Sequence, residues 1–335
     1  MATLKDIAQA TGFSITTVSR VLNRTADQVG ISEATQKKIL QAAEAMNYQP
    51  SNVARGLRTG KMQVVALVVR DMANPFFAEV ACAVQDELES HGYDLLLFNA
   101  KDPSGANDDS VRRLFNMIYR WPIGGLIICQ DMPLSPDDCK RLRLKGIPVV
   151  MINPVLHEGI DAVFVDDRIA SRDAVQHLLE RGHRRIGYLA GPKSMPTGKA
   201  RLEGYIDALT AHGIPVDDRL IVDVAFTAEG GARAMDVLLR LDPPPSAVAA
   251  ANDVSAFGAL KVALDRGLSV PGDLAIIGFD NVGVLTYPAL STVDHNQVGL
   301  GRTAVALLME RIKGDAAAPR KVVVLEHRLV IRDTT

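Results

Sequence analysis

The sequence predicts an all-α helix-turn-helix headpiece at the N-terminus, a short hinge, and an α/β body of two doubly wound lobes. Before residue 48, apolar residues recur at helical spacing. After residue 62, strand-like apolar runs alternate with helical stretches of about 10–15 residues. About eight such strands are more than one doubly wound sheet holds, so we expect two similar lobes. The chain of 335 residues, 47% of them hydrophobic, is long enough for both.

Three short helices are expected in the headpiece. The first ends at Gly12, while Ser14 and Ser32 are the expected N-caps of the second and third. The compact turn at Gly12 has to join two helices that cross steeply, and we expect Val18 to fill the space between them. The outer face of the second helix then carries Ile15, Thr16, Thr17, Ser19 and Arg20.

That outer face suits contact with DNA bases. An arginine can donate two hydrogen bonds to guanine, and Thr or Ile methyl groups can contact the thymine methyl. The charge distribution agrees, because residues 1–60 hold seven Lys/Arg against four Asp/Glu, whereas the whole chain has a net charge of −2. From spacing alone, an ordinary helical hairpin with a solvated polar face stays open as an alternative.

The chain divides into a headpiece at 1–48, a hinge or linker at 49–61, and a body at 62–335. The segment 51–57 is too short to be a stable helix without a partner. In the body, strands are expected at 64–69, 94–98, 125–129, 148–152, 162–165, 185–189, 247–250 and 274–278. Helices are expected at 78–91, 170–181, 199–212, 230–241, 254–266 and 298–312.

Several classes of protein are disfavoured by the composition and motifs. The three cysteines have no metal-ligand spacing, and the histidines show no HExxH arrangement, so no metal site is expected. The run Gly299–Ala304 fits a dinucleotide fingerprint but follows no apolar strand, and no catalytic motif appears, so we expect no cofactor and no enzyme. Without an export signal or an apolar run of about 18 residues, we expect a cytoplasmic protein that does not enter a membrane.

The headpiece and hinge resemble the lactose and purine repressors, the LacI/GalR family. The matching stretches are Leu4-Lys5-Asp6-Ile7-Ala8-Gln9-Ala10, Thr17-Val18-Ser19-Arg20-Val21-Leu22-Asn23, and Asn47-Tyr48-Gln49-Pro50-Ser51-Asn52-Val53-Ala54-Arg55-Gly56-Leu57. The resemblance implies that Ile15 and Thr16 begin a recognition helix in the major groove. It implies further base or phosphate contacts from Thr17, Ser19, Arg20 and Asn23. The segment 24–31 is a few residues longer than family members usually carry, which leaves phosphate contacts there open.

The hinge would contact DNA from the minor groove. The resemblance implies that residues 51–57 fold into a helix only on operator DNA, with Val53, Ala54 and Arg55 in the family register. Leu57 matches the leucine that wedges between the central base steps. The alternative for Leu57 is simple packing on a neighbouring domain.

The body resembles the family's effector domain, which shares its fold with periplasmic sugar-binding proteins. The resemblance rests on Asn74-Pro75-Phe76-Phe77, Asp166-Asp167-Arg168, Arg181-Gly182-His183-Arg184-Arg185-Ile186, Ala190-Gly191-Pro192, Arg201-Leu202-Glu203-Gly204-Tyr205, Ala251-Asn252-Asp253 and Ile277-Gly278-Phe279-Asp280-Asn281. In this family the chain crosses between the lobes three times. We therefore expect residues 62–165 and 294–322 in the first lobe, and 166–293 and 323–335 in the second.

Most of these landmarks follow a strand, where open parallel sheets bind their ligands. The resemblance and their chemistry point to seven effector-binding residues: Phe76, Asp167, Thr197, Arg201, Phe226, Asn252 and Asp280. Arg201, Asn252 and Asp280 would hydrogen-bond a polyol, and the two phenylalanines would form flat walls. A turn-capping role for Asp280 and a core role for Phe77 stay open. Met195 stands where purine-binding members carry an arginine, which favours a sugar or sugar acid.

The resemblance therefore implies a transcription repressor that binds a palindromic operator as a homodimer. A small metabolite between the lobes would shift the population of lobe arrangements and change operator affinity. Whether it acts as an inducer or a co-repressor stays open. Two other classes of protein stay open. A periplasmic sugar-binding protein would need an export signal and no headpiece, and an enzyme with two Rossmann-like domains would need a cofactor fingerprint after a strand and a catalytic pair.

Overall fold

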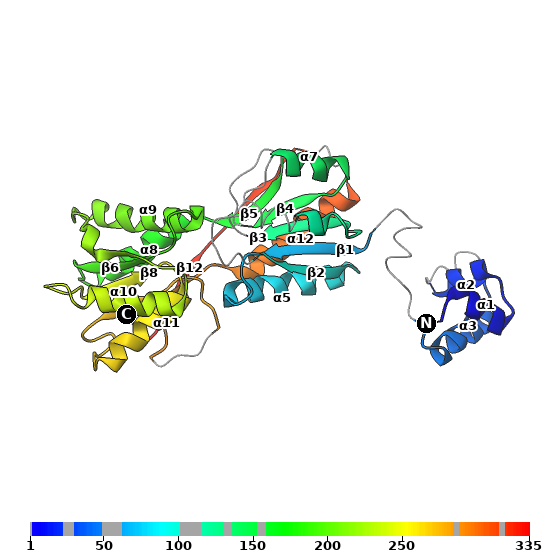
Figure 1. The fold of residues 1–335 in the computed structure, drawn as a ribbon, viewed down its shortest axis with the longest axis horizontal. Coiled ribbons are helices and arrows are strands. Elements are labelled where there is room, and N and C mark those ends of the chain that lie inside the picture. Colours follow the sequence, from blue (N-terminus) through cyan, green and yellow to red (C-terminus); the bar gives the residue numbers. More distant parts are fainter. Residues whose placement is uncertain are drawn as a thin grey trace. The chain divides into compact units, whose positions relative to one another are not determined.

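The fold is a small helical unit followed by a large α/β unit. The computed structural model describes residues 2–22, 30–48, 62–100, 115–129, 136–152, 159–283, 288–314 and 319–335. The chain separates into two compact units, Met1–Gln63 and Val64–Thr335, both drawn in Figure 1. The predicted fold class, a helical headpiece and an α/β body of two lobes, is confirmed. In the described part of the chain, no helix has the length and apolar character needed to cross a membrane.

The described residues of the headpiece, 2–22 and 30–48, form three helices, α1 (Leu4–Thr11), α2 (Ile15–Leu22) and α3 (Glu33–Ala45). Thr3 forms a capping box with Asp6 at the start of α1, and Ser32 caps α3. Gly12 ends α1 at φ 75°, a left-handed conformation that glycine adopts without steric cost. Ile7, Val18 and Ile39 are fully buried at the centre, so the expected role of Val18 between the helices is confirmed.

The first lobe is a six-stranded parallel sheet in the order β11-β5-β4-β3-β1-β2. Its strands are β1 (Val64–Val69), β2 (Asp94–Asn99), β3 (Gly125–Cys129), β4 (Val149–Ile152), β5 (Asp161–Val165) and β11 (Val322–Leu325). One face packs on α5 (Pro75–Ser90) and α12 (Gln297–Lys313), and the opposite face on a cluster that includes Leu142 of α7 (Pro136–Leu144). The central strands are apolar throughout because helices cover both faces.

The second lobe has a four-stranded parallel sheet in the order β7-β6-β8-β9. These strands are β6 (Ile186–Ala190), β7 (Ile221–Asp223), β8 (Ala247–Ala250) and β9 (Ala275–Ile277). The helices are α8 (Asp167–Glu180), α9 (Pro196–Ala211), α10 (Ala228–Leu238) and α11 (Asp253–Asp265). The first two cover one face of this sheet and the last two cover the other (Figure 1). The arrangement is that of a doubly wound sheet.

Three segments connect the lobes. The chain passes from β5 into α8, from β10 (Thr292–Asp294) into α12, and from β11 into β12 (Arg328–Val330). We expected residues 323–335 to belong to the second lobe, with one strand near 322–331. This is wrong for residues 323–325, and the expected strand is divided into β11 and β12. Backbone pairing from Val322↔Ala162 to Leu325↔Val165 keeps β11 in the first sheet, and only β12 pairs with β10.

Candidate functional site

The exposed face of α2 is narrower than the sequence predicted. Ile15 is 50% exposed, and Thr16 and Arg20 are also exposed. Thr17 is half-buried and its N–H donates to Oγ of Ser14 at 3.1 Å, so Ser14 caps this helix as expected.

Ser19 is buried, so the expectation that it lies on the outer face is wrong. It follows Val18 directly and precedes Leu22 by three residues, which places its short side chain at the edge of the buried stripe. The remaining predicted DNA contacts, Asn23, Val53, Ala54, Arg55 and Leu57, lie outside the described residues and stay predictions.

The centre of the candidate ligand site is Arg201, which is 2% exposed although it is charged. Its Nε donates to Oδ1 of Asp167 at 2.6 Å, and its Nη1 donates to the carbonyl oxygen of Ala251 at 2.6 Å and to Oδ1 of Asp280 at 3.3 Å. The guanidinium also lies 3.8 Å from the centroid of the Phe279 ring. Arg201 therefore joins the segments that follow β5, β8 and β9, at the carboxyl ends of these strands.

Burial and charge shift the pKa values of the two carboxylates in opposite directions. Burial raises the pKa of Asp280 to about 6, although Arg201 and His295 work against the rise. Burial also opposes ionisation of Asp167, but the nearby Arg201 and His295 outweigh it and lower the pKa of that group. Asp167, with the shorter ion pair, is the main partner of the guanidinium. Asp280, with the longer contact to Arg201, is the carboxylate that the guanidinium stabilises less.

The buried carboxylate of Asp253 holds the loop that carries Asp280. Oδ1 of Asp253 accepts from the hydroxyl of Thr292 at 2.6 Å, and Oδ2 accepts from the N–H of Val282 at 3.0 Å. Burial, followed by the charge of Asp280, raises the pKa of Asp253 well above its usual value. Gly278 leaves the necessary room, because a Cβ there would lie 2.1 Å from Oδ1 of Asp253.

The carboxylate of Asp280 binds Arg201 and not the backbone of its own turn, so the turn-capping role that stayed open is not what the described residues show. This carboxylate accepts from Arg201, while the N–H of Asn281 donates to the hydroxyl of Thr292 at 3.3 Å.

Asn252, at the start of α11, lies next to Phe226, which precedes α10. The amide Oδ1 of Asn252 caps α11 by accepting from the N–H of Ser255 at 3.0 Å, and its Nδ2 donates to the carbonyl of Phe226 at 3.4 Å. Phe226 adopts φ 53°, and its ring fills the space where a Cβ on Gly191 would lie, 2.2 Å from Cζ. Thr197, in the first turn of α9, is buried.

The aromatic residue Phe76 is 1% exposed, and like Phe77 it belongs to the apolar core of the first lobe. Phe77 therefore has the core role that stayed open in the sequence. Phe76 also reaches the junction of the lobes, where its ring centroid lies 5.4 Å from that of His295.

His295, which follows β10 in the second segment between the lobes, was not predicted from the sequence. Its side chain is fully buried between the rings of Phe76 and Phe279, with Nε2 3.4 Å from Oδ1 of Asp167. The polar run 294–297 between an apolar strand and an amphipathic helix was the signal that could have identified it.

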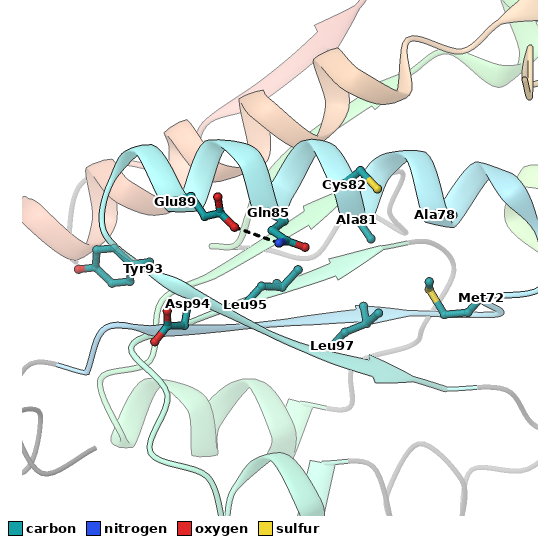
Figure 2. Close-up of a pocket in the computed structure, with 10 residues that line it drawn as sticks. All are labelled: Met72, Ala78, Ala81, Cys82, Gln85, Glu89, Tyr93, Asp94, Leu95 and Leu97. Atoms are coloured by element: carbon teal, nitrogen blue, oxygen red, sulfur yellow. Dashed lines mark hydrogen bonds between the residues drawn. The ribbon is translucent and has the colours of Figure 1, made fainter. Parts of the chain in front are cut away.

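A separate hollow of about 490 Å³ lies on the first lobe, over α5 and the edge strand β2 (Figure 2). Its lining residues are Met72, Ala78, Ala81, Cys82, Gln85, Glu89, Tyr93, Asp94, Leu95 and Leu97. None of them belongs to the cluster around Arg201. This hollow is therefore a second candidate functional site, separate from the cluster around Arg201.

Comparison with known proteins gives the class of the molecule. Residues 3–51 match the model of the bacterial regulatory proteins of the lacI family, and residues 175–335 match the periplasmic binding protein-like domain. The HTH-type transcriptional repressor CytR of Escherichia coli K12 is 35% identical over 337 residues, which cover 100% of this chain and 96% of that protein. Catabolite control protein A of Priestia megaterium is 33% identical, covering 99% of this chain and 98% of that protein.

Solved structures agree with this class. A lac repressor dimer bound to operator and an anti-inducer aligns with a TM-score of 0.84 at 25% identity, over 99% of this chain and 98% of that one. A complex of the transcriptional regulator CelR with cellobiose aligns with a TM-score of 0.73 at 29% identity, over 100% of both chains. The fold and site thus define a DNA-binding transcription regulator with an effector domain. The chain belongs to the LacI family of bacterial regulatory proteins.

Proposed function

We propose that this protein is a repressor that binds a palindromic operator as a homodimer and changes its operator affinity when a sugar-like metabolite binds between the lobes. The observation that carries the proposal is the buried cluster of Arg201, Asp167 and Asp280 at the junction of the lobes. A buried ionic cluster of this kind contributes little to stability by itself, which favours a functional role.

The charges of this cluster favour a neutral ligand. One guanidinium faces two carboxylates, so the cluster carries an excess of negative charge, and the Nε and Nη1 donors of Arg201 are already engaged by Asp167, Ala251 and Asp280. A sugar acid would bring a third carboxylate next to Asp280, whereas the hydroxyl groups of a neutral sugar can donate to it. Of the two ligand classes expected from the sequence, we therefore favour the neutral sugar. Met195, in place of the arginine of purine-binding members, supports a sugar over a purine.

The proposed DNA contacts come from α2. Ile15, Thr16 and Arg20 offer a methyl surface, a hydroxyl and a guanidinium on one exposed face of a helix of eight residues. Asn23 and the hinge residues Val53, Ala54, Arg55 and Leu57 complete the proposal. The CelR structure contains cellobiose, and the lac repressor structure contains operator DNA, which supports both halves of the proposed function.

The proposed dimer contact is the hollow on α5 and β2. β2 is an edge strand of the first sheet, and Leu97 on it is 38% exposed. Leu95, Tyr93 and Met72 extend the apolar surface (Figure 2). Exposed apolar edge strands are normally covered, and a twofold contact between identical faces covers both at once.

A thermal-shift measurement tests the ligand half of the proposal. The purified protein is heated with matched pairs of probes: glucose and glucuronate, cellobiose and cellobionate, and adenosine and adenosine monophosphate. We expect a neutral carbohydrate to raise Tm, and its acid to have no effect. Asp280→Ala should abolish the shift, while the control Asp207→Ala, which removes an exposed partner of Arg168, should retain it. A shift produced only by acids or by nucleotides contradicts the ligand assignment.

A further inference from the structure

The loop that carries Asp280 also makes contact with the first lobe. The N–H groups of residues 280–282 donate to acceptors in the second lobe, which are Val293 O at 2.9 Å, Thr292 Oγ1 at 3.3 Å and Asp253 Oδ2 at 3.0 Å. The next N–H, that of Gly283, donates instead to Oε1 of Glu79 on α5 at 3.2 Å. Four consecutive N–H groups therefore tie the loop to both lobes.

An apolar contact accompanies this hydrogen bond. Val282 is 5% exposed, and it belongs to the core cluster of the first lobe together with Val80 of α5 and Leu300 of α12. A residue of the second lobe thus completes the core of the first. Separating the lobes at this point exposes the valine and leaves the Gly283 N–H without its protein partner.

The backbone of the loop has an unusual conformation. Asp280 has φ 112° and Asn281 has φ 55°, so two consecutive residues other than glycine are left-handed. Such conformations persist only where the surroundings hold them. Here Arg332 donates to Oδ1 of Asn281 at 2.7 Å, and Asp253 holds the N–H of Val282. The carboxylate of Asp280 and the N–H that crosses to Glu79 are three residues apart in this constrained segment.

We propose that residues 280–283 form an interlobe latch. The hydrogen bond from Gly283 to Glu79, with the inserted Val282, biases the two lobes toward the arrangement described above. A ligand bound at Asp280 acts on the same segment, so its binding free energy is coupled to the state of the latch. This link to the ligand rests on the proposed function, whereas the bias itself does not.

Distance measurements between the lobes test the latch without ligand or DNA. Spin labels are attached through Lys140→Cys on α7 and Arg240→Cys after α10, both exposed positions. The full chain also carries Cys82→Ser and Cys139→Ser, while the buried Cys129 stays. Dilution with unlabelled chain restricts the signal to one molecule. The variants are Glu79→Gln and Glu79→Ala, and the control is Glu87→Ala on the same helix.

The latch predicts a stepwise decrease in the fraction of molecules whose lobes have the arrangement of this structure, called closed here. The fraction of molecules at the interlobe distance of this structure falls from wild type to Glu79→Gln to Glu79→Ala. The ratio of closed to open molecules drops by about fivefold in the last variant, as expected for one hydrogen bond. Gly283→Pro, which removes the donor and leaves α5 unchanged, shifts the population in the same direction. The Glu87→Ala distribution matches wild type.

Identical distributions in all folded variants overturn the latch, as does a wild-type distribution that lacks the distance seen here. Far-UV circular dichroism identifies variants that fail to fold, and the conservative Glu79→Gln then decides the result. Because no DNA or sugar is present, this outcome is independent of the proposed function. A protein that binds no operator can still have the latch, and a repressor without the latch can still bind its operator.

Discussion

Asp167 and Asp280 share one guanidinium unequally: the Nε–Oδ1 distance from Arg201 to Asp167 is 2.6 Å, while the Nη1–Oδ1 distance to Asp280 is 3.3 Å. The pKa values follow this difference, being lowered for Asp167 and raised to about 6 for Asp280. Asp280 is therefore the less stabilised carboxylate of the pair, and its ionisation costs stability near neutral pH.

Asp280→Asn should stabilise the ligand-free protein above pH 7. Because the folded-state pKa of about 6 lies above the unfolded value of 3.8, wild-type stability attributable to this group is present at low pH and is lost as pH rises through 6. The asparagine variant avoids that loss, so it should be about 2–3 kcal/mol more stable than wild type at pH 8 and close to it at pH 3.5, below the unfolded pKa. Urea unfolding at the two pH values measures the difference. An equal effect at both pH values contradicts the assignment, and Asp207→Asn, at an exposed ion pair, is the control.

Removing the guanidinium should have the opposite effect. Arg201→Leu leaves two buried carboxylates without their partner and should destabilise the folded state by about 3–5 kcal/mol at pH 7.5. Combining it with Asp280→Asn should restore part of this loss, because one buried charge is then removed. Unfolding of the two single variants and the double variant in guanidinium chloride gives the coupling energy between Arg201 and Asp280. Strict additivity would contradict the shared cluster.

The exposed apolar residue of α2 should matter for DNA rather than for folding. Ile15→Ala should weaken binding to an operator selected from a random duplex pool by about tenfold, as expected for losing one good base contact, and leave the melting temperature nearly unchanged. Leu40 on α3 is also 50% exposed, so Leu40→Ala is a matched control that should leave operator affinity intact. Equal effects of the two substitutions would place the DNA elsewhere. Fluorescence anisotropy supplies the affinities.

The two edges of the first sheet provide a test of the proposed dimer. Leu97→Asp on the edge strand β2 should shift the protein from dimer to monomer in sedimentation velocity, because a charge is then buried at the centre of the contact. Val324 is 57% exposed on β11, the opposite edge strand, so Val324→Asp is the matched control and should leave the dimer intact. Dissociation by the control alone would move the contact to the other edge.

Much of the fold was predictable because its elements are locally encoded. All eight predicted strands of the body are present, within one or two residues at their ends. The strands β7 and β10 were missed because their three residues end in an aspartate and form no apolar run, unlike the equally short β9. The strands β11 and β12 were expected as one strand near 322–331. The predicted helices began one to three residues late, because caps such as Asn74 and first-turn residues such as Pro75 resemble loop residues in sequence.

The candidate site was predictable only in part. Asp167 and Asp280 follow strands and Arg201 lies on α9, and the structure brings the three together as expected. Phe279 resembles the end of an apolar strand, so no local signal marks its place beside Arg201. The polar run 294–297 singles out His295 but does not indicate that it lies beside Asp167. The shared guanidinium depends on contacts between residues 34 and 79 positions apart in the sequence, which periodicity and capping rules do not reach.

The central claim is tested most directly by operator affinity measured with and without ligand. Labelled operator selected by the full-length protein is titrated at 50–200 mM salt, with the neutral sugar identified by thermal shift present or absent. We expect affinity to fall steeply with salt. We also expect the sugar to change the operator Kd by about tenfold or more in wild type and not in Asp280→Ala. Salt-sensitive binding that no ligand changes, or a change that persists in Asp280→Ala, would contradict the account.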